Sequence, residues 1–222
     1  MNVVTENRRE ASKRETRALI LRAARRLFAR KSVEECTLRD VAREAGVSAA
    51  SVVVHFKNKT GLLEAALDCD IDRTLVASTA SLKPRQGLLA SLQHLGRAFL
   101  MLYDGNRPLY RALIRRTLLE SWNDTPHMAK LSARYVEFLV NLVEAEKERG
   151  RVRPEIDSKV AAGVLFSVYL GALVVLFRHP EATVDKAVEA LTAMTTQYLT
   201  GIEVRRENTA DSASKTGNRP RR

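Results

Sequence analysis

Two hydroxyl side chains, Thr37 and Ser48, stand where two short helical segments are expected to begin. Thr37 is followed at the third position by Asp40, which gives an N-terminal capping arrangement with an acidic partner. Ser48 precedes a second short segment that ends at Phe56, and Gly46 between the segments suits a tight turn. Because a helix N-terminus carries free N–H groups and a partial positive charge, the chemistry available here is phosphate binding.

Two short helices joined by a tight turn, with a longer helix before them, indicate a helix-turn-helix unit. The longer helix is predicted over residues 13–31, where apolar residues recur at helical spacing. In such a unit the second short helix enters the DNA major groove, which is about 12 Å wide. That helix, residues 49–56, offers few base-reading donors, although its apolar side chains could contact thymine methyl groups. Specificity would therefore lean on DNA shape and on the basic N-terminal arm.

The basic charge of the chain is concentrated at its ends. The net charge is +11 over 222 residues, and residues 1–60 hold 14 Lys/Arg against 7 Asp/Glu. Residues 61–204 hold 17 of each, whereas residues 205–222 hold six basic and two acidic groups. A basic small domain on a neutral body indicates a polyanionic partner, with nucleic acid the first candidate. A basic surface that serves only solubility is the alternative.

The remaining sequence is typical of an all-α protein with two folded domains. Nothing alternates with period 2 over a useful length, and apolar residues recur at helical spacing throughout. Further helices are predicted over residues 60–79, 87–103, 107–121, 125–149, 156–177 and 183–204. The expected organisation is a disordered arm (1–12), a three-helix helix-turn-helix DNA-binding domain (13–60), a larger helical domain (61–204) for ligand binding and dimerisation, and a disordered basic tail (205–222).

Three runs of sequence resemble the N-terminal DNA-binding domain of the TetR family of bacterial transcriptional regulators. They read LILRAARRLFAR at residues 19–30, TLRDVAREAGVS at residues 37–48 and HFKNKTGLL at residues 55–63. The matching elements are Ala24, Phe28, Thr37, Val41, Ala42, Ala45-Gly46-Val47-Ser48, Phe56, Lys59 and Leu62-Leu63. Two positions depart from the family pattern: Ser32 replaces the usual glycine, and Val53 replaces a tyrosine that normally contacts a DNA phosphate.

The resemblance implies ligand-responsive transcriptional control, usually repression, by a homodimer on a near-palindromic, double-stranded operator. An effector bound in the C-terminal domain would move the fourth helix and change the distance between the two recognition helices. The expected DNA contacts are Thr37, Ser48, Ala49, Ala50, Ser51, Val53, His55 and Lys59. Two alternatives are a transcriptional activator of the same fold and a small-molecule-binding helical enzyme.

The family resemblance also favours an effector pocket in the middle domain. The candidate lining residues are Phe99, Tyr103, Tyr110, Trp122, Tyr135, Phe138, Phe166 and Tyr169. Phe99 with Tyr103, and Tyr135 with Phe138, lie about one turn apart, so each pair is expected to face one space. The effector is expected to be small and largely hydrophobic, with three basic groups available for an anionic part: His94, Arg97 and Arg134. Simple core packing of these aromatic residues is the alternative.

The last two helices are predicted to pair with those of a second copy, forming a four-helix bundle. Gly163, Ser167 and Gly171 recur every four residues and would permit close backbone approach. The last helix would add Leu191, Met194 and Tyr198 to this dimer interface. The alternative is that both apolar stripes belong to the core of one subunit.

Other functional classes find little support. The cysteines, Cys36 and Cys69, lack metal-site spacing, and the four histidines are scattered, so no metal and no cofactor are expected. No nucleotide-binding or hydrolase motif occurs, which argues against an enzyme. The polar start of the chain suits a cytoplasmic protein. The uncharged stretch 160–177 leaves a membrane helix as a minor alternative to a buried one.

Overall fold

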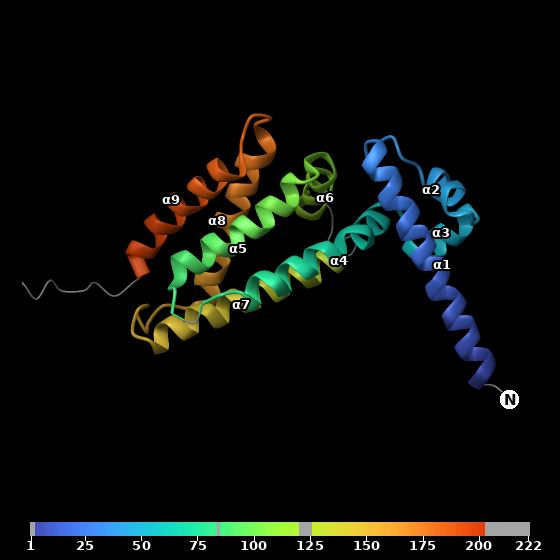
Figure 1. Ribbon diagram of the computed structural model, residues 1–222. Coiled ribbons are helices and arrows are strands. Elements are labelled where there is room, and N and C mark those ends of the chain that lie inside the picture. Colours follow the sequence, from blue (N-terminus) through green and yellow to red (C-terminus); the bar gives the residue numbers. More distant parts are fainter. Residues whose placement is uncertain (1–2, 84, 120–125, 203–222) are drawn as a thin grey trace, which may run out of the picture.

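The computed structural model describes residues 3–83, 85–119 and 126–202. Within these residues the regular structure consists of nine helices and no strands, which confirms the predicted all-α fold (Figure 1). The helices are α1 (Val3–Arg30), α2 (Leu38–Ala45), α3 (Ala49–Phe56), α4 (Lys59–Ala80), α5 (Leu88–Asp104), α6 (Arg107–Leu119), α7 (Pro126–Glu148), α8 (Ser158–Arg178) and α9 (Val184–Ile202). The expected basic tail, 205–222, lies outside the described residues.

Helices α1, α2 and α3 pack against one another and against the start of α4 to form the N-terminal domain. The buried stripe of α1 consists of Ile20, Ala23, Ala24 and Phe28, which recur at helical spacing. The small side chains of the two alanines allow neighbouring backbones to approach α1 closely. The apolar periodicity of residues 13–31 therefore predicted this contact surface correctly.

The expectation of a disordered arm over residues 1–12 is wrong for residues 3–12, which belong to α1. Residues 3–12 contain no glycine or proline and include Glu, Arg and Ala, which favour helix. The side chains of residues 8–15 are exposed, so this part of α1 extends into solvent without a packing partner. Helix propensity and continuity with α1 explain its structure.

Helix α4 runs from the N-terminal domain into the larger helical body (Figure 1). At its start it is tied to α1, since Arg25 Nε donates a 2.7 Å hydrogen bond to the carbonyl of Ala66. An acidic row on α4 that begins at Glu64 contacts α7. Buried Glu64 accepts a 3.1 Å hydrogen bond from the Met128 N–H, and Asp72 pairs with Arg134. A displacement of α4 against α7 would therefore be transmitted to the helix-turn-helix unit.

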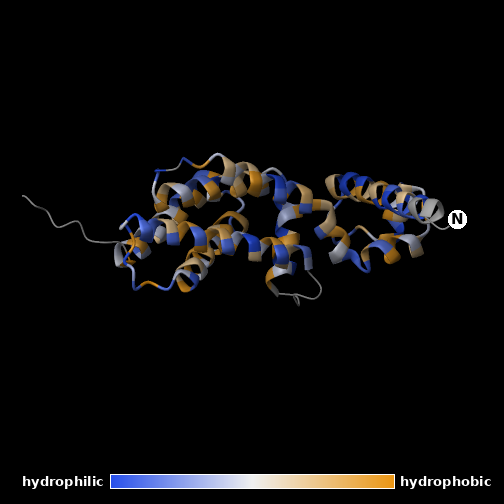
Figure 2. Ribbon diagram, turned by 90° about the horizontal axis from the view of Figure 1, so that it is seen from below, coloured by the Kyte–Doolittle hydropathy of each residue, from blue (hydrophilic) through white to orange (hydrophobic). Residues whose placement is uncertain are grey.

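Helices α5 to α9 form the larger body, in which α9 packs against both α5 and α8. Helices α5 and α9 pack tightly at Gly96 of α5, where an added Cβ would collide with the side chain of Leu191 from α9. Seen from below, the molecule is elongated and has hydrophobic residues in both parts (Figure 2). The small residue at position 96 thus sets how closely α5 and α9 cross.

Helix α8 is the one helix of the described residues that is long and apolar enough to cross a membrane. Its buried residues include Ala161, Leu165, Leu173 and Leu176, which face the body of the subunit. Only 39% of its apolar window is buried, so a large part of this helix presents apolar side chains outward. The buried row identifies α8 as a core helix with a second, uncovered apolar face.

Candidate functional site

The turn between α2 and α3 is fixed by local contacts. Thr37 caps α2: its Oγ1 accepts a 3.1 Å hydrogen bond from the Asp40 N–H, and its own N–H donates to Asp40 Oδ2 at 3.0 Å. Hydrogen bonds from the Thr37 side chain and backbone lower the pKa of the Asp40 carboxyl. Gly46 ends α2 with φ 69°, a left-handed conformation that favours glycine. The predicted capping box and glycine turn are both confirmed.

Helix α3 presents an apolar outer surface. Ser48 caps it by accepting a 3.1 Å hydrogen bond from the Ser51 N–H, while Val52 and Phe56 are buried against the domain. Val53 is 47% exposed and Val54 is 78% exposed. Val54 is not among the DNA contacts predicted from the sequence. Its position next to Val53 in the same short helix could have indicated that it is exposed. The outer surface of α3 is therefore built mainly from methyl groups.

The other predicted DNA-contact residues lie on or beside α3 with different exposure. Ala50 is exposed, whereas Ala49, Ser51 and His55 are half-buried. The His55 ring centroid lies 6.1 Å from that of Phe56, so His55 also packs within the domain. The structure thus brings the predicted set to one end of the molecule, and their contact with DNA remains a prediction.

Lys59 at the start of α4 has a contact within the protein. Its Nζ donates a 2.9 Å hydrogen bond to the backbone carbonyl of Glu34 in the loop between α1 and α2. Lys57, directly after α3, is exposed and has φ 61°, the one positive φ among the described non-glycine residues. Lys57 is not among the predicted DNA contacts, because only Lys59 of the two lysines matches the family pattern. Both lysines place basic groups near the end of α3.

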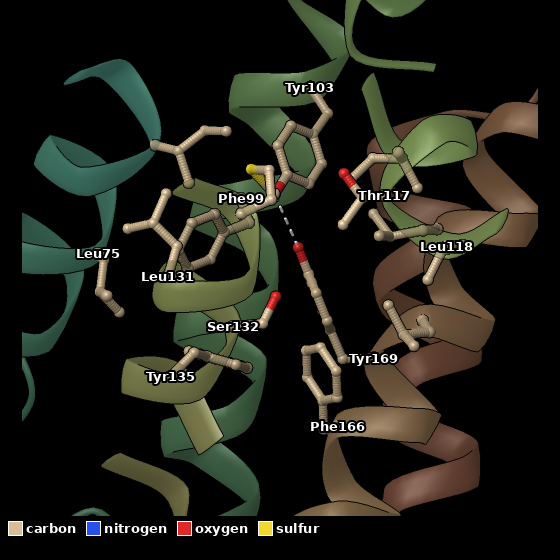
Figure 3. Close-up of a pocket in the computed structure, with 15 residues that line it drawn as sticks. Leu75, Phe99, Tyr103, Thr117, Leu118, Leu131, Ser132, Tyr135, Phe166 and Tyr169 are labelled. Carbon is tan, nitrogen blue, oxygen red and sulfur yellow. Dashed lines mark hydrogen bonds between the residues drawn. The ribbon is translucent and has the colours of Figure 1, made fainter. Parts of the chain in front are cut away.

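A cavity of about 60 Å³ lies between α4, α5, α6, α7 and α8 (Figure 3). Its fifteen lining residues carry no formal charge. The Tyr169 hydroxyl donates a 3.2 Å hydrogen bond to the Tyr103 hydroxyl across it, with Ser132 and Thr117 nearby. Burial raises the pKa of Tyr103 to about 12 and also raises the pKa values of Tyr135 and Tyr169. The tyrosines therefore remain neutral hydrogen-bonding groups at physiological pH.

Five of the predicted effector residues line this cavity: Phe99, Tyr103, Tyr135, Phe166 and Tyr169. Tyr110 does not, because its ring packs behind Tyr103 at a centroid distance of 5.0 Å. Phe138 is also misplaced, since it lines a different hollow near Gly87 and Glu146. The offset of roughly 60° between positions three apart on α7 is enough for Phe138 to face the neighbouring hollow while Tyr135 faces the cavity. Trp122 lies outside the described residues.

The three basic groups suggested for an anionic part of the effector do not line the cavity. Arg97 pairs with Asp185 at 2.7 Å, and Arg134 pairs with Asp72. His94 shares a 2.8 Å hydrogen bond with Ser81. Helical periodicity alone could not show that these residues face outward, because their helices are covered on several sides.

A family model described as bacterial regulatory proteins of the tetR family matches residues 20–66. The match starts at the buried stripe of α1, contains the whole α2–turn–α3 unit and ends in α4. Residues 20–66 of this chain therefore match the TetR family.

The similarity to curated regulators is strongest over this segment. The regulator TtgR of Pseudomonas putida is 46% identical over 54 residues, which are 24% of this chain and 26% of that protein. This match thus spans about a quarter of the length of TtgR. The regulator UidR of Escherichia coli is 23% identical over 197 residues, covering 83% of this chain and 93% of its own.

Solved structures extend the likeness to the whole fold. A TetR-family regulator from Pectobacterium atrosepticum matches with a TM-score of 0.64 and 21% identity, over 88% of this chain and 97% of that one. NalD, the secondary repressor of the MexAB-OprM multidrug efflux pump in Pseudomonas aeruginosa, matches with a TM-score of 0.58 and 23% identity. The match covers 87% of this chain and 98% of the NalD chain. At these identities the comparison shows that the larger domain shares the TetR-family fold.

The uncovered face of α8 carries the small residues predicted for a TetR-type dimer interface. Gly163 has no other atom within 4 Å of an added Cβ, and Ser167 is exposed. Val160 is 63% exposed at the start of the same helix, whereas Val174, 52% exposed near the other end, lines a separate surface hollow. An added Cβ at Gly171 would lie 3.3 Å from Met194 of the same subunit. Together these residues leave a shallow apolar face open for a second copy.

One residue assigned to that interface is wrong. Leu191 is buried, because it fills the notch above Gly96 of α5 inside the subunit. Met194 is exposed and Tyr198 is half-buried, so both retain surface that a partner can contact. Sequence periodicity places Leu191 on an apolar stripe but does not show which of two neighbouring helices covers it.

The described residues offer little support for a metal site or for a reactive cysteine. No group of three His, Cys, Asp or Glu residues there could hold a metal ion. Cys36 is buried just before the cap of α2, and this burial raises the pKa of its thiol. A raised pKa lowers the thiolate fraction, so the Cys36 thiol should react slowly with oxidants and electrophiles.

Proposed function

We propose that this protein is a transcriptional regulator that binds operator DNA as a homodimer and releases it when a small, mainly apolar effector enters the cavity. The observation that carries the proposal is the capped α2–Gly46–α3 unit within the segment that matches the TetR family. Such a unit places its second helix in the major groove while the first crosses the backbone. The protein would act in the cytoplasm, on chromosomal DNA.

The charge distribution supports a DNA partner for the N-terminal domain. Residues 1–60 carry 14 basic and 7 acidic residues, a net charge of +7. Some of this charge is internally paired, since Arg26 contacts Glu44 at 2.9 Å and Arg43 contacts Asp40. Exposed Arg39 and Lys57 remain near the helix ends and supplement the predicted set from Thr37 to Lys59. Phosphate contacts by these groups would make affinity fall steeply with salt.

The open face of α8 and α9 supports dimerisation. A helix-turn-helix dimer must hold its recognition helices about 34 Å apart, one turn of DNA, to reach both half-sites. An apolar row centred on Gly163 and Ser167, with Met194 and Tyr198 beside it, can pair with itself about a two-fold axis. Dimerisation through this face would leave both N-terminal domains free for DNA.

The size of the cavity supports an effector that changes the structure. A drug-sized ligand usually needs about 300–1,000 Å³, whereas this cavity measures about 60 Å³. A ligand must therefore push its walls apart, and Ile71 and Leu75 of α4 are among them. Because α4 also carries the helix-turn-helix unit, expansion would move the recognition helices. Repression with release by an effector is the form we propose, and NalD is described as a repressor.

The test is selection of bound fragments from the host genome with the purified chain, followed by binding titrations on the enriched fragment. The expected result is enrichment of a near-palindromic site, bound by a dimer with a strong salt dependence. A panel of apolar compounds should then raise the melting temperature and release the DNA. Failure to enrich any fragment over bulk DNA, by a protein that is folded and dimeric, would refute the proposal.

A further inference from the structure

A second hollow of about 220 Å³ lies on the surface between α6 and α8, directly beside the central cavity. The two hollows share four lining residues, which are Ile114, Leu118, Leu170 and Leu173. A single layer of apolar side chains therefore separates the surface groove from the cavity. Leu118 is half exposed and lies at the cavity wall, so it is the most easily displaced part of that layer (Figure 3).

The groove is strongly basic. Three of its nine lining residues are arginines, Arg111, Arg115 and Arg178, and none is acidic. All three are exposed, and for Arg111 and Arg178 we find neither an ion pair nor a hydrogen bond within the described residues. Arg115 contacts Glu34 at 3.1 Å, but both side chains are more than half exposed, so this pair is weak. Three cations thus surround an apolar floor, and among the described residues only Arg115 has an anionic partner, which is exposed Glu34.

We propose that the effector is an amphipathic anion. Its apolar part enters the central cavity, and its anionic group binds Arg111, Arg115 and Arg178 in the groove. Planar guanidinium groups bind carboxylate and phosphate through paired, charge-assisted hydrogen bonds. The uncharged cavity can take only the apolar part, because it holds no cation that would compensate a buried anion. This inference rests on the proposed function and names the chemical class of its effector.

The groove also connects the effector to the DNA-binding domain. Glu34 lies in the loop between α1 and α2, and its carbonyl accepts the hydrogen bond from Lys59 at the start of α4. The contact of Arg115 with the Glu34 carboxylate joins α6 to this loop. A ligand anion would compete with Glu34 for Arg115 and weaken that link. By thermodynamic reciprocity, loss of the Glu34 carboxylate should strengthen binding of the anion.

The first test is calorimetric titration of the full chain, without DNA, using decanoate, decanol and decylamine as probes of equal chain length. Decanoate should bind at least about tenfold more tightly than decanol, as expected for a charge-assisted contact. Arg178→Gln and Arg111→Gln should each remove most of that preference and leave decanol binding unchanged. Arg97→Gln, which neutralises an exposed arginine on α5 away from the groove, is the matched control. The proposal would be overturned if decanol bound as tightly as decanoate. It would also be overturned if the preference for decanoate over decanol persisted in both Arg178→Gln and Arg111→Gln.

The second test compares Glu34→Gln with Glu35→Gln, which removes the same charge from the neighbouring position of the same loop. Glu34→Gln should raise decanoate affinity about two- to fivefold, the range of an exposed ion pair, whereas Glu35→Gln should not. No gain in Glu34→Gln would contradict the competition for Arg115. These titrations need no DNA, so their failure in a protein that binds its operator refutes only the effector class. A clear anion preference without operator binding would instead refute the proposed function.

Discussion

The helix-turn-helix unit and the central cavity differ in what determines them. In the first, Thr37, Gly46 and Ser48 act on groups only a few residues away, through caps and a left-handed turn. The cavity is assembled from five helices, and its lining runs from Ile71 to Leu173. Local hydrogen-bonding rules thus fix the helix-turn-helix unit, whereas the shape of the cavity depends on how distant helices pack. Changes in the two regions should therefore have separable effects.

The largest effect is expected from a change far from the DNA. Gly163→Arg places a charge on the open face of α8, where an added side chain meets no atom of its own subunit. It should shift the dimer to monomer and reduce operator affinity roughly 100-fold or more, because linked binding modules gain 10²–10⁴ in avidity. Light scattering after size exclusion and fluorescence anisotropy would measure both. Ala77→Arg, on an exposed position of α4, is the control. If the Gly163→Arg protein remains a dimer, the open face of α8 is not the dimer interface.

Gly61→Ala tests where tertiary contacts override local propensity. An alanine is favoured over glycine inside a helix by about 1 kcal/mol, so sequence rules alone predict stabilisation of α4. The added Cβ would lie 2.5 Å from the backbone carbonyl oxygen of Phe56, the last residue of α3. We therefore expect a loss of about 1–3 kcal/mol in the free energy of unfolding, measured with denaturant. Gly105→Ala, with 3.4 Å to the nearest such atom, should be neutral or stabilising.

The sequence predicted the features set by local hydrogen bonds better than the features set by the packing of distant helices. Capping of α2 and α3 and, apart from the first ten residues of α1, the approximate positions of the helices in the described residues could be read from the chain, since these signals lie within a turn or two of each other. Leu191 and Phe138 were misassigned because periodicity identifies an apolar stripe but not the helix that covers it. The arginine groove could not be found, since Arg111 and Arg178 lie on helices far apart in sequence. Sites built by packing require the structure.

A moderate effect should come from the cap of the recognition helix. Ser48→Ala removes the hydroxyl that accepts from the Ser51 N–H and should cost about 1 kcal/mol in the free energy of unfolding. It should also weaken operator binding, because the N-terminus of α3 is held less firmly. Asp157→Ala removes the corresponding cap of α8, so it should lower the melting temperature without that loss of affinity. Equal operator affinities in both variants would argue against a role for the start of α3.

The smallest effect concerns alkaline stability of the cavity. Burial raises the pKa of Tyr103 to about 12, above the value of about 10 for an unfolded tyrosine. The unfolded state loses its proton first, so this contribution to stability is complete below pH 10 and is lost as the pH rises toward 12. Thermal unfolding across that window should show a falling melting temperature, with a shallower fall in Tyr103→Phe. Identical profiles would show that the hydroxyl is not desolvated in solution.

The central claim, that the outer face of α3 contacts operator DNA, is tested most directly by a charge on Val54. This side chain is 78% exposed on α3, so Val54→Glu should not disturb the core. Val76→Glu on α4 is the matched control, since Val76 is 52% exposed and lies outside the N-terminal domain. Anisotropy titrations on the selected genomic fragment should show operator binding lost in Val54→Glu and retained in Val76→Glu, with equal melting temperatures. Wild-type affinity in Val54→Glu would contradict the account.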